Sequence, residues 1–580
     1  MPLRGSEHVR LRAFLLVMFV LLLLGIHALD FGRGSRATTS SSGRSSEQLV
    51  GTPPQLGASS SGVLLFMIDG LAVGPFEKAL AKGQLPHIAG LLRTRPTSAM
   101  RAISTFPSAT SPSVPEFVSG RYAELENLPA PGAVHAFDRE QRRVIRYLTN
   151  PDFWQWPLVT LFDATRHLSS ITVFEGRWDG PKSILTQFNM TRQAVMEIIG
   201  AHELAEGDRP PVEAFLEVVR SAGLPALSFV VMNDFDMAAH FYGPYSYEAQ
   251  EALKAIDALF GEILATLAAI PGKKKSSILD ETNIILFGDH GHVASSEFVD
   301  LQAFFNQQGL KAVDVSTIPH IVFRERLGSL WTEWPDVILV SGGSNIAQVY
   351  LKQKGDSWEK ASAPDSVPRH AKMSGSSDLP TLAAAISGIR GIDQVLWQDS
   401  SGSTYVRAAD NRSARIATRT VANEVRYAYV VDEKAQQDPF AYLDSPATRS
   451  LVCREHQVGD SCFLRREEWF DRTFGSPYPG AVALVPKAFH PQRFTGDLMV
   501  TLKPGYSFLR GQQGDHGNLS REAVLTPLIL NGPGIGPCRE RHRAKLVDLY
   551  PSVAVLLGAA ADDPAFNGLD GRVLDCVSGQ

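Results

Sequence analysis

The sequence has little of several features that would each indicate a particular class of protein. It contains only four cysteines in 580 residues and no Cys-x-x-Cys pair, which argues against a cysteine-based metal site. Its formal net charge is -5 and its only dense basic run covers residues 273–275, which argues against broad nucleic-acid binding. What remains is the composition of an ordinary globular protein that can bury a large core, 44% hydrophobic and 20% charged.

Long apolar runs are equally scarce, because only residues 13–29 form one. Arg4, Arg10 and Arg12 precede this run, and a basic segment followed by an apolar core is typical of a secretory signal peptide. The run is close to the lower length for a membrane span, so a retained signal anchor is the alternative. Either interpretation of residues 1–30 places the body of the chain outside the cytosol, secreted or periplasmic. Residues 31–61, rich in Ser, Gly and Thr, predict a disordered linker.

The four cysteines fit an oxidising compartment. Cys453 and Cys462 lie close together in the sequence, and Cys538 and Cys576 lie near the C-terminus. Among the three possible connectivities we expect two disulfides with this local pairing. Free thiols are the alternative.

Short apolar runs alternate with helical patterns from residue 62 onward. Candidate buried strands cover residues 63–69, 227–234, 282–290 and 525–532, and residues 247–268 show apolar spacings of three and four. This alternation predicts an α/β fold, a mainly parallel sheet with helices on both faces. Residues 385–475 alternate instead like half-exposed strands, which predicts a smaller β-rich or mixed insert within a catalytic domain of residues 62–580.

Acidic residues follow three of the candidate strands. Asp69 follows the apolar run at 63–68, Asp234 and Asp236 follow the run at 227–233, and Asp289 with His290 follows the run at 283–288. One such Asp is usually a turn former or a helix cap. Three together are harder to explain that way, because ligands bind parallel sheets at the carboxyl ends of the strands.

Two further histidines extend this set. Asp236 and His240 are four residues apart, so on a helix they share one face and can bind one ion, and His516 lies between glycines late in the chain. Asp and His ligands without Cys suit zinc in a catalytic setting, and also manganese or iron. Two divalent ions among three carboxylates leave about one positive charge, which suits an anionic substrate and in-line phosphoryl transfer.

The order of the motifs resembles the alkaline phosphatase superfamily. The motifs are Ile-Asp-Gly at 68–70, a Ser/Thr-Pro loop that ends in Ser-Gly at 119–120, Asp-x-x-x-His-Phe-Tyr-Gly-Pro at 236–244, and Gly-Asp-His-Gly at 288–291 and again at 514–517. Each is modest alone, whereas their order is specific. The resemblance covers most of residues 62–580 and is strongest to the type I phosphodiesterase and nucleotide pyrophosphatase branch.

This resemblance implies a threonine nucleophile within the segment TFPSATSPSVPEFVSG, residues 105–120. Members of the branch carry it ten residues before the Gly of the following Thr-Gly or Ser-Gly pair. Thr110 lies ten residues before Gly120 and Thr105 lies fifteen before it, so Thr110 is predicted and Thr105 is the alternative. A threonine hydroxyl is a poor nucleophile until a metal lowers its pKa.

The resemblance also implies two divalent metal ions, which we expect to be zinc. One would be held by Asp69, Asp289, His290 and the Thr110 oxygen, and the other by Asp236, His240 and His516. Thr110 would attack phosphorus, and the second ion would stabilise the departing oxygen and then supply hydroxide to the phospho-threonine. Asp515 is expected to be solvated rather than to support His516. His292, where relatives often carry Met, is expected to be an ordinary polar residue rather than a ligand.

Departures from the branch bear on the substrate. Ser111 replaces the aromatic residue that follows the nucleophile in nucleotide-cleaving relatives, and their phosphate-contacting Asn is not evident, with Asn127 and His135 as candidates. The Cys-x-Pro-x-Arg motif of a sulfatase is absent. These departures leave recognition of a nucleotide base open, whereas the other motifs predict metal-assisted phosphoryl transfer. We predict a phosphodiesterase or pyrophosphatase acting on a nucleotide or other small phosphodiester, without a stable nucleic-acid complex.

Two other functions stay open at this point. One is a phosphomonoesterase or a transferase of phosphoethanolamine or phosphoglycerol, which a retained membrane anchor would favour. The other is a binding protein without catalysis, which absence of bound metal would favour.

Overall fold

The computed structural model describes residues 62–94, 97–122, 135–139, 142–146, 160–164, 170–173, 207–315, 335–341, 345–352, 379–422, 424–489, 494–538 and 543–577, together with Pro54 and Leu56. All of them belong to one compact unit, Val50–Gln580. The predicted signal or anchor and nearly all of the predicted linker lie outside them. Within these ranges no helix is long and apolar enough to cross a membrane.

The first sheet of the described chain has seven strands and is largely parallel. Their order is β22 (Ala544–Lys545), β2 (Thr97–Ile103), β21 (Leu525–Asn531), β7 (Asn283–Phe287), β1 (Val63–Ile68), β6 (Leu227–Met232) and β5 (Ser170–Val173). β5, β6, β1 and β7 are parallel neighbours, and β21 runs antiparallel to β7 and β2. All four strands predicted from apolar runs are present, at β1, β6, β7 and β21.

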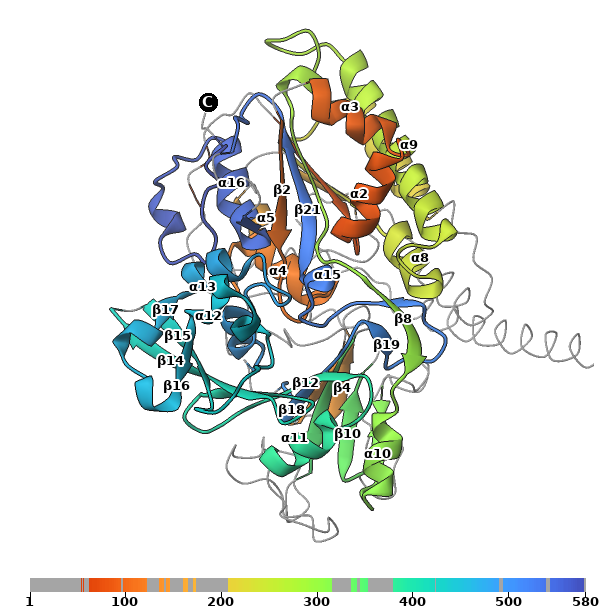
Figure 1. The fold of residues 1–580 in the computed structure, drawn as a ribbon. Helices are drawn as coiled ribbons and strands as arrows, with labels where there is room; N and C mark the ends of the chain where they lie inside the picture. Colours follow the sequence, from red (N-terminus) through yellow and green to blue (C-terminus); the bar gives the residue numbers. More distant parts are fainter. Residues whose placement is uncertain are drawn as a thin grey trace, which may run out of the picture. The chain divides into compact units, whose positions relative to one another are not determined.

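Both faces of this sheet are covered by hydrophobic core. Successive side chains of β1 point to opposite faces, and each set packs into a different core cluster. Val63, Leu65 and Met67 belong to one core cluster, and Leu64, Phe66 and Ile68 belong to another. The first cluster includes side chains from α4 (Thr110–Ser119), α5 (Leu161–Ala164) and α16 (Leu549–Leu556). The second includes side chains from α2 (Val73–Ala81), α3 (Pro86–Thr94), α7 (Arg209–Ala222), α8 (Asp234–Tyr242) and α9 (Tyr247–Ala269). In Figure 1, α16 and α9 lie on opposite sides of β2 and β21.

A second sheet has ten strands in the described residues and is mainly antiparallel. Its order is β16 (Val452–Arg454), β15 (Glu424–Val431), β14 (Ser413–Val421), β13 (Thr404–Ala408), β12 (Ile392–Gln398), β18 (Leu498–Leu502), β11 (Ile346–Leu351), β10 (Val337–Val340) and β9 (Ala312–Asp314), with β17 (Leu464–Arg465) paired to β15. The strands within residues 385–475 thus continue into strands on either side of that range. The division into a catalytic domain and an insert stays a prediction.

Smaller elements complete the described part. Two small sheets contain β8 (Val293–Phe298), β19 (Gly505–Ser507) and β20 (Gly514–Asp515) in one, and β3 (His135–Asp138) and β4 (Arg143–Arg146) in the other. Further helices are α10 (Leu301–Gln307), α11 (Leu379–Ser387), α12 (Pro446–Arg449), α13 (Arg466–Thr473), α14 (Ala481–Leu484) and α15 (Arg521–Val524).

The cysteines pair as expected. Cys453 is bonded to Cys462, and Cys538 is bonded to Cys576. The predicted local pairing is confirmed.

Candidate metal centre and active site

The predicted acidic and histidine residues meet at one edge of the first sheet. β1, β6 and β7 are adjacent and parallel, so their carboxyl ends lie together. Asp69 directly follows β1, and Asp289 and His290 follow β7 after Gly288. Helix α8 begins two residues after β6 and carries Asp236 and His240 one turn apart. Sequence spacing alone therefore predicts this gathering.

A first cluster of donors consists of Asp69, Asp289 and His290, whose ligand atoms lie within 4.8 Å of one another. His290 Nε2 is 3.3 Å from Asp69 Oδ1 and 3.6 Å from Asp289 Oδ2. The hydroxyl oxygen of Thr110 lies 3.1 Å from Asp69 Oδ1 and 3.2 Å from His290 Nε2. Thr110 is thus in contact with this cluster.

Helix α4 places Thr110 there, because Thr110 is its first residue. The hydroxyl groups of Ser104 and Ser113 both donate to the backbone carbonyl of Asp289, the latter at 2.8 Å. These bonds tie the segment before α4 and its first turn to the end of β7. The loop that precedes Thr110 and the Asp289 loop therefore hold each other in place.

A second cluster consists of Asp236, His240, His292 and His516, again with ligand atoms within 4.8 Å of one another. His240 Nε2 is 3.3 Å from Asp236 Oδ2, and His516 Nε2 is 3.1 Å from His240 Nε2. His516 reaches this place because β20, which ends at Asp515, pairs with β8. Six of the seven predicted site residues therefore lie in these two clusters, and the seventh, Thr110, contacts the first.

Backbone carbonyls fix the orientation of three of the imidazoles. Nδ1 of His290 faces the carbonyl oxygen of Gly291 at 3.0 Å, and Nδ1 of His516 faces that of Ser108 at 3.0 Å. Nδ1 of His240 faces the carbonyl oxygen of Gly514 at 3.3 Å. A ring that donates from Nδ1 presents the lone pair of Nε2 to the cluster, which is the usual arrangement of metal-binding histidines.

Burial and crowding shift the pKa values of these groups. Burial, together with the nearby carboxyl groups of Asp289 and Asp236, raises the pKa of Asp69 to about 8. Burial alone would lower the pKa of His290, but the carboxylates of Asp289 and Asp69 raise it to about 10. Burial lowers the pKa of His516 well below its usual range, which keeps this ring in the neutral form that binds metals. A divalent cation would supply counter-charge to such crowded carboxylates.

The residues present fit bound divalent ions. The second cluster brings Asp236 Oδ2 and the Nε2 atoms of His240 and His516 close together. The first cluster contains a buried carboxylate oxygen, Asp289 Oδ2, without a hydrogen-bond partner among the described residues. A buried acceptor left in this way is costly, and a metal ion would satisfy it. The donors are oxygen and imidazole nitrogen, which suit zinc, manganese or iron.

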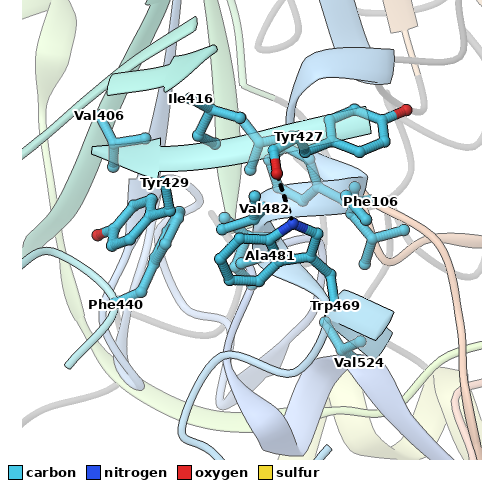
Figure 2. Packing of buried hydrophobic residues seen from close by; sticks show 14 of the residues in the cluster. Phe106, Val406, Ile416, Tyr427, Tyr429, Phe440, Trp469, Ala481, Val482 and Val524 are labelled. Atoms are coloured by element: carbon cyan, nitrogen blue, oxygen red, sulfur yellow. Dashed lines mark hydrogen bonds between the residues drawn. The ribbon is translucent and has the colours of Figure 1, made fainter. Parts of the chain in front are cut away.

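Thr105, the alternative nucleophile, has different surroundings. It is 2% exposed, and its hydroxyl accepts a hydrogen bond from Lys487, which lies in the short helix Pro486–Phe489 and also contacts Glu116 of α4. Phe106 is fully buried in the core cluster that surrounds Trp469, as Figure 2 shows. The segment from Thr105 to Phe106 therefore anchors the loop, whereas Thr110 faces Asp69 and His290.

The surroundings of two residues differ from those expected. Asp515 is fully buried rather than solvated, because its carboxylate accepts hydrogen bonds from the backbone of His516 and the hydroxyl of Ser507. His292 is not an ordinary polar residue, because it is 1% exposed and lies within the second cluster. The sequence signal at this position is its place two residues after His290, which does not by itself indicate burial.

Other predicted positions give less information. Ser111 is buried in the first turn of α4. Asn127 and the side chain of His135 lie outside the described residues.

A pocket of about 530 Å³ lies beside the second cluster. Its lining includes His292, Tyr242, Tyr245, Ser295 and Glu522. Two of the lining residues, Tyr242 and Tyr245, are aromatic, and they are 36% and 48% exposed. A pocket of this kind is large enough to admit part of a small ligand.

Fold and site together define a class. A largely parallel sheet that gathers carboxylates, imidazoles and a threonine hydroxyl at its carboxyl edge is the arrangement of a metal-dependent α/β hydrolase. A family model described as type I phosphodiesterase / nucleotide pyrophosphatase matches residues 63–384, more than half of the chain. The chain belongs to this family, whose members hydrolyse phosphoester bonds. No curated protein sequence matches the chain.

Several solved structures are similar to the chain over most of its length. Murine ectonucleotide pyrophosphatase/phosphodiesterase 5 shares 12% identity with a TM-score of 0.47, and the match covers 88% of this chain and 99% of that one. Phosphonoacetate hydrolase from Sinorhizobium meliloti 1021 shares 14% identity with a TM-score of 0.48, covering 88% and 100%. The human ectonucleotide pyrophosphatase/phosphodiesterase 5 shares 13% identity with a TM-score of 0.46, covering 89% and 100%. An inactive murine variant was solved with AMP, and the hydrolase with phosphonoformate and with phosphonoacetate.

Proposed function

We propose that this protein is a phosphodiesterase or pyrophosphatase that acts outside the cytosol through a Thr110 nucleophile and two divalent metal ions, most simply zinc. The observation that carries the proposal is the position of the Thr110 hydroxyl oxygen, 3.1 Å from Asp69 Oδ1 and 3.2 Å from His290 Nε2 at the start of α4. The hydroxyls of Ser108, Ser113 and Ser119 instead donate to backbone carbonyls, and that of Thr105 accepts from Lys487.

The ligand sets follow from the two clusters. Asp69, Asp289, His290 and the Thr110 oxygen would hold one ion, and Asp236, His240 and His516 would hold the other. Bound there, the ions would supply the positive charge that lowers the pKa of the Thr110 hydroxyl and offsets the charge of a phosphate.

The chain's own groups account for the remaining chemistry. Asp69 accepts the hydrogen bond of the Thr110 hydroxyl, so the proton that leaves this oxygen has an acceptor at hand. The N-terminus of the ten-residue helix α4 directs the positive end of its dipole toward a phosphate bound at Thr110. Thr110 Oγ1 forms the new bond to phosphorus, and the bond to the leaving oxygen breaks. Water then hydrolyses the phospho-threonine and restores the hydroxyl.

Location outside the cytosol is supported by two independent features. The basic and apolar N-terminal segment predicts export, and both cysteine pairs are oxidised. The proposed substrate is a small phosphodiester or nucleotide, because the chain belongs to the type I phosphodiesterase / nucleotide pyrophosphatase family.

The test compares turnover of bis(p-nitrophenyl) phosphate with that of p-nitrophenyl phosphate by the purified, zinc-loaded full chain. A strong preference for the diester supports the proposal. A preference for the monoester would contradict it in favour of a phosphatase. No turnover of either compound by a zinc-bound protein would contradict hydrolysis and direct attention to a transferase whose acceptor is absent.

A further inference from the structure

His292 reaches the second cluster through the pairing of β8 with β20. β8 begins at Val293, β20 ends at Asp515, and these two residues are partners in the antiparallel register. The residues just outside the paired ends, His292 and His516, are therefore brought side by side. Their ring centroids are 5.2 Å apart, and the His292 centroid is 4.6 Å from that of His240.

The ring of His292 faces Asp236. Its Nε2 lies 3.2 Å from Asp236 Oδ1, and the side chain of His292 is fully buried. Neither ring nitrogen of His292, nor Asp236 Oδ1, has a hydrogen bond of good geometry within the described residues. Two buried polar groups thus stand within reach of each other, each needing a partner.

Gly70 makes this approach possible. A Cβ atom at Gly70 would lie 2.5 Å from Asp236 Oδ1 and 3.1 Å from His292 Cδ2, and the φ angle of Gly70 is +67°. The glycine of the Ile-Asp-Gly motif therefore leaves room for Asp236 and His292 to lie against the end of β1.

We propose that His292 is a positioning residue that donates from Nε2 to Asp236 Oδ1 and so holds this carboxylate in the orientation that binds the second ion. The inference rests on the proposed function. With Oδ1 held, Oδ2, which lies 3.3 Å from His240 Nε2, is the oxygen available to an ion shared with His240 and His516. Metal-binding carboxylates are commonly oriented by such a partner.

A direct ligand role for His292 fits the chemistry less well. Asp236, His240, His292 and His516 together would close a tetrahedral site, whereas a catalytic ion keeps a position open for substrate. Three ligands with His292 behind one of them leave that position open.

The test measures zinc binding and cobalt spectra of the full chain in three variants. His292→Met keeps the size of the side chain but has no hydrogen-bond donor. His292→Asn has a donor on a side chain too short to reach Asp236 Oδ1, and His292→Gln places an amide nitrogen near the position of Nε2. We expect His292→Met and His292→Asn to bind the second zinc about 10- to 100-fold more weakly and His292→Gln to stay within about threefold of the wild type. The visible spectrum of the cobalt-loaded protein should keep its nitrogen ligands in all three.

Two results would overturn this inference without overturning the proposed function. One is an unchanged zinc affinity in His292→Met and His292→Asn while the wild type binds two zinc ions, which leaves the proposed function standing. The other is a cobalt spectrum that loses a nitrogen ligand in every variant, which would make His292 a direct ligand. A wild type that binds fewer than two zinc ions overturns the proposed function and this inference with it. Thermal unfolding confirms that each variant is folded, and the Asn variant replaces the Met variant if the latter does not fold.

Discussion

The two threonines of the segment TFPSATSP offer a matched pair of substitutions that separates catalysis from stability. Thr110→Val and Thr105→Val each exchange one hydroxyl for a methyl group of similar size. The first removes the oxygen that contacts Asp69 and His290, and the second removes the acceptor of the Lys487 ammonium. The two changes should therefore have opposite signatures.

The magnitudes follow from what each hydroxyl does. Without its nucleophile Thr110→Val should lose at least about 1,000-fold in kcat/KM, which is about 4 kcal/mol of transition-state stabilisation. Thr105→Val deletes one buried hydrogen bond to a charged donor, which should lower the free energy of unfolding by about 1.5–3 kcal/mol. In Thr105→Val, Lys487 would still contact the carboxylate of Glu116 and the ring of Tyr122, whose centroid is 4.6 Å away. The value of kcat/KM should therefore stay within about twofold of the wild type.

The assays are initial rates of diester hydrolysis and urea unfolding of both variants beside the wild type. Zinc content is measured on the same samples, so that lost activity is not confused with lost metal. The assignment of the nucleophile is refuted if Thr110→Val retains more than about a tenth of the wild-type kcat/KM. It is equally refuted if Thr105→Val is folded, zinc-bound and inactive.

Three further predictions concern stability. Removal of zinc by a chelator should lower the melting temperature, since an ion present at about 1,000 times its dissociation constant stabilises the fold by about 4 kcal/mol. Calorimetry should show that the melting temperature recovers when zinc is added back. An unchanged melting temperature would contradict metal binding by the two clusters. Replacing both Cys538 and Cys576 with Ser should cost about 1 kcal/mol more than replacing Cys453 and Cys462, because the bridges span 38 and 9 residues, and equal losses in urea unfolding would contradict this. Lys487→Met removes the cationic partner of buried Glu116 and should cost about 3–5 kcal/mol, whereas a loss below about 1 kcal/mol would show that the pair is not structural.

The parts of the site that local patterns could predict are those next to strands of the first sheet. Asp69 and Asp289 follow apolar runs that become β1 and β7, and Asp236 and His240 share a helical face whose spacing is visible in the sequence. Parallel strands bring their carboxyl ends to one edge of a sheet, so residues that follow such strands can be expected at that edge without a structure. Thr110 needed the resemblance, because nothing local separates it from Thr105.

The burial of His292 and Asp515 could not be predicted in this way. Both depend on the pairing of β8 with β20, two short strands more than 200 residues apart. No alternation of apolar residues in the sequence predicts these two strands. The second sheet poses the same difficulty, because β18 lies between β12 and β11. Long-range pairing of short strands decides which polar groups are buried, and sequence periodicity carries little information about it.

Metal stoichiometry tests the central claim most directly. The full chain, purified with zinc and dialysed, would be analysed by plasma mass spectrometry beside Asp289→Ala and Asp236→Ala, one from each cluster. The account predicts about two zinc ions per wild-type chain, fewer in each variant, and loss of diester hydrolysis in both. An active wild type without bound metal, or an Asp289→Ala protein with unchanged metal content and activity, would contradict it.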